Sequence, residues 1–120
     1  MRFSISLLLL GVAFAAPAAD KERAPTRNQF YGAIAYHAET RAVGWATDRK
    51  SSREARLEAL KQCGNESCVV VATVTRGCAA LARGPKQTFV QKGTTQQEAQ
   101  TKSLGKCGKG CEIAAWVCTK

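Results

Sequence analysis

The chain repeats one pattern twice, and this duplication limits its possible folds more than any other feature. Each half reads as strand-like segments, a capped helix, a Cys-Gly pair, a second cysteine and an apolar strand. One constant offset relates the matching residues of the helical parts: Trp45 with Phe89, Ser51 with Thr95, Glu54 with Glu98, Ala55 with Ala99, Leu60 with Leu104, Cys63 with Cys107 and Gly64 with Gly108. Folding therefore explains most of the ordered chain, which leaves few residues as candidates for catalysis.

The first 18 residues are typical of a secretory signal peptide. Arg2 precedes an apolar run from Ile5 to Ala16, and small residues follow it. The run is too short to span a bilayer and no second apolar stretch follows, so the sequence predicts no transmembrane anchor. Residues 19–29 are polar, lack periodicity and are expected to form a flexible leader. We therefore expect an exported protein, periplasmic or secreted, with a single duplicated domain over residues 30–119 and repeats of about 30–76 and 77–119.

Six cysteines lie in this domain, as is common in small exported domains that bury a modest fraction of their surface. The duplication narrows their pairing, because each half is expected to close its own short loop and the remaining two cysteines would meet on antiparallel strands. The predicted disulfides are Cys63–Cys68, Cys107–Cys111 and Cys78–Cys118. Zinc binding by the Cys-x4-Cys and Cys-x3-Cys pairs is the weaker alternative, because a signal peptide directs the chain to compartments where disulfides form. We therefore expect no metal and no cofactor.

Strand and helix signals occur in the order strand, strand, helix, strand in each half. The predicted strands are residues 31–36, 42–46, 68–75, 78–82, 88–91 and 111–118. The first helix is predicted over residues 52–63, and Thr95 opens the second, each behind a hydroxyl residue three positions before a Glu. The apolar run over residues 68–75 lacks alternation and is expected in the middle of a sheet.

These signals predict an α+β fold made of two ββαβ repeats related by a pseudo-two-fold axis and stapled by disulfides. The strands would form one mostly antiparallel sheet or two small facing sheets, with both helices outside. Trp45 and Trp116 are expected in the core, and the alternative is an exposed pair of rings that binds sugar or protein.

Three blocks of the sequence resemble a family of small exported bacterial domains of unknown function, which carries YGAIAY, GW and CALARG blocks. The blocks are Tyr31-Gly32-Ala33-Ile34-Ala35-Tyr36, Gly44-Trp45 and Cys78-Ala79-Ala80-Leu81-Ala82-Arg83-Gly84. The resemblance covers about residues 31–119 and implies export, intramolecular disulfides and a duplicated fold, with no catalytic residues to carry over. The second half departs from the pattern, because Thr88-Phe89 stands where the first half has Gly44-Trp45.

The chain is basic, with 18 Lys and Arg against 9 Asp and Glu. Loss of Arg2 with the signal peptide leaves 17 against 9, a net charge of +8. For an exported protein this charge favours an acidic protein or an anionic envelope polymer or lipid as the partner and disfavours nucleic acid. The candidate binding residues are Arg49, Lys50, Arg53, Arg56 and Arg83. The sequence is compatible with either a monomer or a homodimer.

Catalytic motifs are absent from the sequence. His37, the single histidine, is expected in an exposed turn beside Glu39, and no Gly-x-Ser-x-Gly or His-Glu-x-x-His occurs. We therefore expect an exported non-enzymatic binding protein with a basic face for an acidic protein or an anionic envelope component, one form of which is an inhibitor or immunity protein. The alternatives are a secreted effector that acts on a host or rival cell and, ranked last, a small hydrolase.

Overall fold

The computed structural model describes residues 29–120. Its elements follow the predicted order: β1 (Tyr31–Tyr36), β2 (Val43–Arg49), α1 (Ser52–Cys63), β3 (Val69–Thr75), β4 (Cys78–Arg83), β5 (Thr88–Gly93), α2 (Gln96–Cys107) and β6 (Glu112–Cys118). The predicted signal peptide, and the predicted leader except Gln29, lie outside the described residues. The first helix has the predicted limits, and the strands agree to within a few residues.

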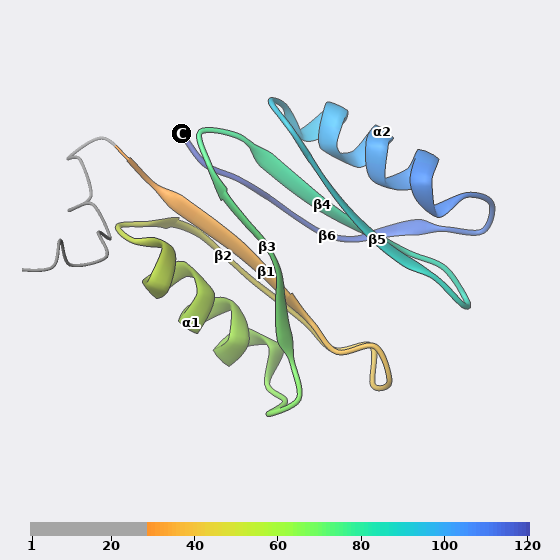
Figure 1. Cartoon of the computed structure of the whole chain (residues 1–120), viewed down its shortest axis with the longest axis horizontal. Coiled ribbons are helices and arrows are strands. Elements are labelled where there is room, and N and C mark those ends of the chain that lie inside the picture. The colour runs from red at the N-terminus through yellow and green to blue at the C-terminus, as the bar shows by residue number, and fades with distance from the viewer. Residues whose placement is uncertain (1–28) are drawn as a thin grey trace, which may run out of the picture.

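The strands form two antiparallel sheets of three strands each, in the orders β2-β1-β3 and β5-β4-β6. The expectation of a single sheet is therefore wrong, and the alternative of two small facing sheets is right. The sheets pack against each other in the middle of the molecule, with α1 outside one and α2 outside the other (Figure 1). The fold is thus α+β in four layers.

The apolar run of β3 is an edge strand, not the central strand that its composition predicts. The central strands are β1 and β4, whose residues are almost all buried and include five alanines. Val69 at the start of β3 is 59% exposed. The unbroken apolar run of this strand therefore includes solvent-exposed residues and does not indicate burial on both faces. Continuous hydrophobicity therefore failed to separate an edge strand from a central one.

The central core lies between the two sheets. Its buried residues are Ile34, Tyr36, Ala72, Val74, Ala79, Leu81, Ala115 and Val117. A hydrogen bond of 3.4 Å from the Thr88 hydroxyl to the Tyr36 hydroxyl also links the sheets. Side chains from both sheets contribute, so neither sheet has a complete core without the other.

Helix α1 has the limits that the sequence predicts, and of its predicted capping box the hydrogen bond to Ser51 forms. The Ser51 hydroxyl accepts a hydrogen bond from the backbone N–H of Glu54 at 3.1 Å. Gly64 ends the helix with a φ of 72°, a left-handed conformation that glycine adopts without strain. The buried face of the helix consists of Ala55, Ala59 and Cys63. These short side chains let the helix axis lie close to the sheet.

Helix α2 covers the second sheet with Ala99, Ser103 and Cys107. Ser103 is fully buried, and its hydroxyl donates to the carbonyl of Ala80 at 2.6 Å and accepts from the N–H of Gln91 at 3.1 Å. Both polar functions of the buried hydroxyl are therefore satisfied, so it fixes α2 against β4 and β5 without an unpaired group.

The N-terminus of α2 departs from the capping box that the sequence predicts. The Thr95 hydroxyl accepts from the N–H of Glu98, as expected. The Glu98 carboxylate instead binds Thr94, accepting from its N–H at 3.2 Å and its hydroxyl at 2.7 Å, and pairs with Lys102 at 2.8 Å. The bond from Lys102 and those from Thr94 lower the pKa of Glu98 from 4.5 to about 2.

Three disulfides join Cys63 to Cys68, Cys107 to Cys111 and Cys78 to Cys118, which are the pairs that the duplication indicates. Cys78 lies directly opposite Cys118 in the register of β4 and β6. The first two disulfides close chain segments at the ends of the helices, whereas the third ties the last strand to a central one. The described residues contain no free cysteine.

We predict that removing the Cys78–Cys118 disulfide destabilises the protein more than removing either short one. On the chain-entropy model, a separation of 40 residues corresponds to about 4 kcal/mol, and separations of 5 or 4 residues correspond to about 2 kcal/mol. Urea unfolding of the Cys78→Ala/Cys118→Ala and Cys107→Ala/Cys111→Ala double variants measures the difference. Equal losses of unfolding free energy would contradict the prediction.

Gly44→Ala is predicted to destabilise the protein by about 1–3 kcal/mol, because an added methyl group would overlap α1. A Cβ at this position would collide with the Ala59 carbonyl oxygen and the Cys63 nitrogen, which are backbone atoms that cannot rotate away. Gly105→Ala is the matched control, since nothing lies within 4 Å of its added Cβ, and it should stabilise α2 by about 0.5–1 kcal/mol. Thermal unfolding of both variants tests the prediction, which fails if Gly44→Ala is neutral.

The Glu98 pKa predicts a pH dependence of stability. Because the folded-state pKa lies below its usual value, the carboxylate contributes fully above about pH 4.5, and this contribution is lost as the pH falls towards about 2. Glu98→Gln should therefore reduce the loss of unfolding free energy over that range, whereas Glu66→Gln, at an exposed turn, should follow the wild type. Urea unfolding at several pH values gives the slopes. Identical slopes for Glu98→Gln and the wild type would refute the prediction.

Candidate functional site

A groove of about 510 Å³ lies where β2 of one sheet meets β6 of the other. Its lining comprises Trp45, Thr47, Gln100, Ile113, Ala114, Ala115 and Trp116. These residues come from β2, α2 and β6, so both halves of the chain build the groove. None of them is charged, and no single sequence motif contains them.

The two tryptophans are exposed, and their predicted place in the core is wrong. Trp45 is 50% exposed and Trp116 is 43% exposed. Both lie on edge strands, so one side of each ring has no neighbouring strand to cover it.

The two indole rings reach the groove from opposite sides of strand β6. Trp45 lies opposite Ile34, whose side chain belongs to the core between the sheets. Trp116 lies opposite Ala80, whose side chain faces α2. Paired residues of antiparallel strands project on the same face, so the strand β6 runs between the two indoles.

The lining can bind a ligand through surface contact and contains no charged side chain. Indoles supply large apolar area and an N–H donor, and they are enriched where one protein anchors another. Gln100 and Thr47 add an amide and a hydroxyl at the walls. A mostly apolar groove with a few polar groups is typical of a recognition site.

The first four candidate cations lie at the start of α1. Arg49 ends β2, Lys50 follows it, and Arg53 and Arg56 are exposed residues of the helix. The Arg49 guanidinium lies 3.7 Å from the Glu58 carboxylate, so part of its charge is already compensated. Glu58 accepts a hydrogen bond from Gln62, which, together with Arg49 and Lys61, lowers the pKa of its carboxyl.

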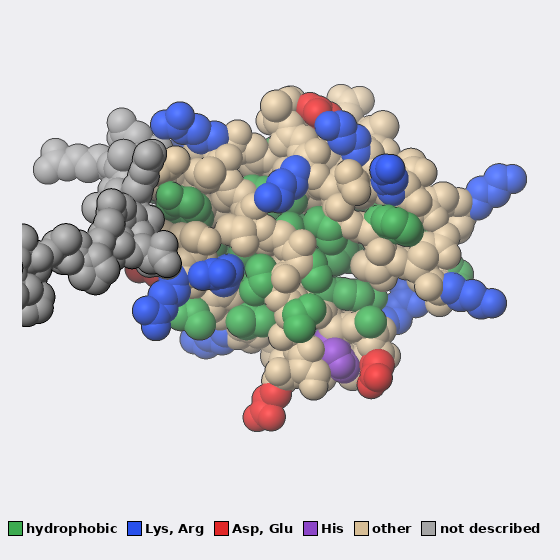
Figure 2. Space-filling view, viewed as in Figure 1, with side chains coloured by type: hydrophobic (Ala, Val, Ile, Leu, Met, Phe, Trp, Pro, Cys, Tyr) green, Lys and Arg blue, Asp and Glu red, His purple; other side chains and the backbone are tan. Residues whose placement is uncertain are grey.

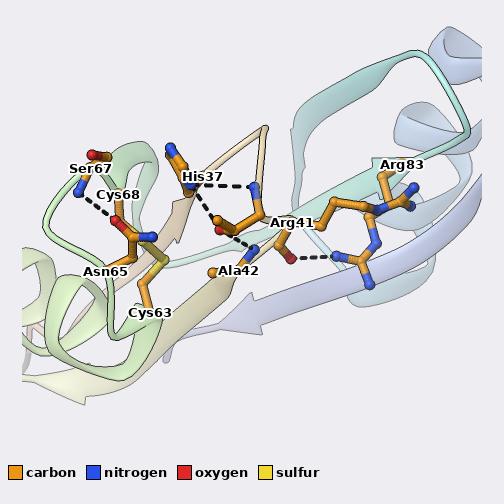
Figure 3. Close-up of a disulfide and its surroundings, with 9 residues drawn as sticks. His37, Arg41, Ala42, Cys63, Asn65, Ser67, Cys68 and Arg83 are labelled. Atoms are coloured by element: carbon orange, nitrogen blue, oxygen red, sulfur yellow. Dashed lines mark hydrogen bonds between the residues drawn. A yellow bond between two sulfur atoms is a disulfide. The ribbon is translucent and has the colours of Figure 1, made fainter.

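Arg83 does not belong to this cluster. Its guanidinium Nη1 donates to the carbonyl of Arg41 at 2.8 Å and so ties the end of β4 to the loop between β1 and β2 (Figure 3). Its Nε is buried and has no hydrogen-bond partner. The contacts of Arg83 connect the two halves of the fold, and no local sequence signal predicts this contact because the two arginines are 42 positions apart.

The cationic side chains are not gathered in one patch on the face that Figure 2 shows. On that face, Lys and Arg lie mainly around the periphery, and hydrophobic side chains lie nearer the middle (Figure 2). The view therefore shows distributed positive charge rather than one basic face.

His37 lies in the loop after β1, where its Nδ1 is 2.8 Å from the Thr40 hydroxyl. Figure 3 shows this contact beside the Cys63–Cys68 disulfide. Within residues 29–120, no three His, Cys, Asp or Glu side chains are grouped so that they could hold a metal ion. In the same part of the chain, no helix has the length and apolar character needed to cross a membrane.

Comparison with known proteins gives a family but no activity. The model of DUF4189, a domain of unknown function, matches residues 31–118. The uncharacterised proteins Rv1813c of Mycobacterium tuberculosis and Mb1843c of Mycobacterium bovis are each 34% identical to this chain over 88 residues. Each match covers 73% of this chain and 59% of the relative, so the chain spans about three-fifths of the length of these proteins.

A solved structure supports the fold. The NMR structure of Rv1813c from Mycobacterium tuberculosis aligns with a TM-score of 0.60 and 28% identity over 74% of each chain. The family match begins at the first residue of β1 and ends at the last residue of β6, so it includes every element described above. This chain therefore belongs to DUF4189, a family of domains of unknown function.

Proposed function

We propose that this protein is an exported, non-enzymatic binding protein for an acidic protein or an anionic envelope component, and that an inhibitor or immunity protein is one form of this function. The observation that supports the proposal is the groove that Trp45 and Trp116 line. Two half-exposed tryptophans in one concave site give a small domain a large anchoring surface.

The tryptophan-lined groove and the positive charge have different roles in the proposed binding. The groove lining is uncharged, so the affinity of the complex would come from an apolar side chain of the partner buried in the groove against the indoles. The positive charge would attract an anionic partner and raise the association rate. Arg53 and Arg56 are exposed and available for this long-range attraction.

The disulfides support export. Three disulfides are typical of proteins that fold in an oxidising compartment, such as the periplasm or the exterior of the cell. They also make the scaffold rigid, so little ordering free energy would be lost when the groove is filled. The signal peptide predicted over residues 1–18 would provide the export route.

We also propose that the domain is an internal duplication whose two units are related by a pseudo-two-fold axis. Both units have the order strand, strand, helix, strand, and in both the first strand is central. Each helix also has a hydroxyl N-cap that binds the N–H three residues later. These likenesses favour descent of the two units from one ancestor. The groove forms where the units differ, because Trp116 has no aromatic counterpart in β3.

We predict that Trp45→Ala and Trp116→Ala each weaken partner binding at least tenfold, because hot-spot aromatics contribute about 2 kcal/mol or more. The protein with intact disulfides would be immobilised and exposed to envelope and secreted fractions, and retained proteins would be eluted along a salt gradient and identified by mass spectrometry. Retention of one acidic protein at high salt, lost in both variants, is the expected result.

Phe89→Ala is the matched control, since Phe89 is an edge-strand aromatic with 38% exposure that does not line the groove. Its retention of the partner should equal that of the wild type. Arg53→Gln/Arg56→Gln should slow association at low salt and leave dissociation unchanged. Release of every ligand at moderate salt, with no effect of the tryptophan variants, would contradict the specific-partner proposal. That result would favour charge-driven association with membranes, which is the behaviour expected of the alternative function, a secreted effector.

A further inference from the structure

We propose that a second cleft, beside the start of α2, binds a phosphate group. The cleft has a volume of about 410 Å³ and lies where the turn between β3 and β4 meets the end of β5 and the first turns of α2. Arg76, Lys92 and Lys102 line it from these three places. The inference deepens the proposed function, because it gives the anionic component a chemical class and a site.

The cleft has an excess of uncompensated positive charge. Glu98 is its single acidic residue, and its carboxylate is already held by Lys102 and by two bonds from Thr94. Among residues 29–120, the ion pairs are Arg49–Glu58 and Glu98–Lys102, so Arg76 and Lys92 have no acidic partner there. A ligand anion would therefore meet two free cations and a third that it shares with Glu98.

Arg76 has a backbone conformation that its residue type disfavours. Its φ is +53° in the two-residue turn between β3 and β4, where a glycine would be unstrained. Non-glycine residues in the left-handed region are uncommon and concentrate at functional sites. Arg41 and Asp48 also have a positive φ and do not line the cleft, so this conformation alone marks no site. The turn does, however, place the Arg76 side chain in the cleft lining together with Lys92.

The chemistry of the lining favours phosphate over a carboxylate. A phosphate has three or more acceptor oxygens and can accept from several donors at once, and arginine binds it through two parallel N–H donors. The hydroxyl of Thr75 adds a neutral donor to the same lining. Both a phospholipid headgroup and free phosphate present this group.

The cleft is separate from the tryptophan groove. Glu98 and Lys102 are four residues apart and share one side of α2, whereas Gln100, between them in sequence, lines the groove. The helix thus lies between the two sites. A substitution in one should leave the other unchanged, which allows the two proposals to be tested independently.

The test is titration of the protein, with its disulfides intact, by inorganic phosphate at constant ionic strength, followed by amide shifts in ¹H–¹⁵N NMR spectra. Saturable shifts at Arg76, Gly77, Gly93 and Thr94 are expected. Lys92→Gln should weaken binding about fivefold or more through loss of one charge-assisted contact. Lys109→Gln is the matched control, because this exposed lysine carries the same charge outside the cleft.

Arg76→Gly separates binding from folding. It removes the guanidinium and relieves the left-handed backbone, so phosphate affinity should fall while the urea midpoint of unfolding rises. Vesicles of phosphatidylglycerol and of phosphatidylcholine identify the source: retention on phosphatidylglycerol that Arg76→Gly abolishes assigns a lipid headgroup, and saturable phosphate binding without retention assigns free phosphate. Shifts that do not saturate, or an equal loss in Lys109→Gln, would overturn the inference. The tryptophan variants would still decide the proposed function.

Discussion

Close approach between each helix and its sheet is the constraint on which the rest of this structure depends. Gly44 brings β2 against the backbone of α1, and Gly93 brings β5 close to the first turn of α2. The buried helix faces are built largely from alanine and half-cystine, which keep the layers thin. The two indoles lie half exposed on the edge strands β2 and β6, where the groove forms.

The disulfides hold the edges in place. β6 is an edge strand that carries Trp116, and it pairs with β4 along one side. The Cys78–Cys118 disulfide fastens the last residue of β6 to the first residue of β4. A surface held in this way loses little freedom on binding, so more of the contact energy can appear as affinity.

The two candidate sites differ in the physical force that each would use. The tryptophan groove is uncharged and depends on buried area, which salt affects little. The cleft of Arg76, Lys92 and Lys102 depends on charge, which salt screens. A ligand that occupies both, such as a phosphate-bearing apolar molecule or an acidic protein at a membrane surface, would gain from two separate contacts on either side of α2.

Local signals in the sequence determine much of this fold. Hydroxyl N-caps at Ser51 and Thr95 and the glycine after Cys63 placed the helix ends, because these signals act through backbone groups within one turn. The duplication expected from the sequence predicted the disulfide pairs, because it places the two short-loop pairs at corresponding positions. The basic charge and the lack of a catalytic motif likewise needed only the sequence.

Tertiary structure alone decided which strands are edges, and the candidate sites followed from that. The valine-rich β3 reads as central yet has one open side, and the tryptophans read as core yet lie where no neighbouring strand covers them. Trp45 and Trp116 are 71 positions apart in sequence but line one groove. Composition reports how apolar a segment is, whereas exposure depends on which strands, far apart in the chain, pair and which sides they leave open.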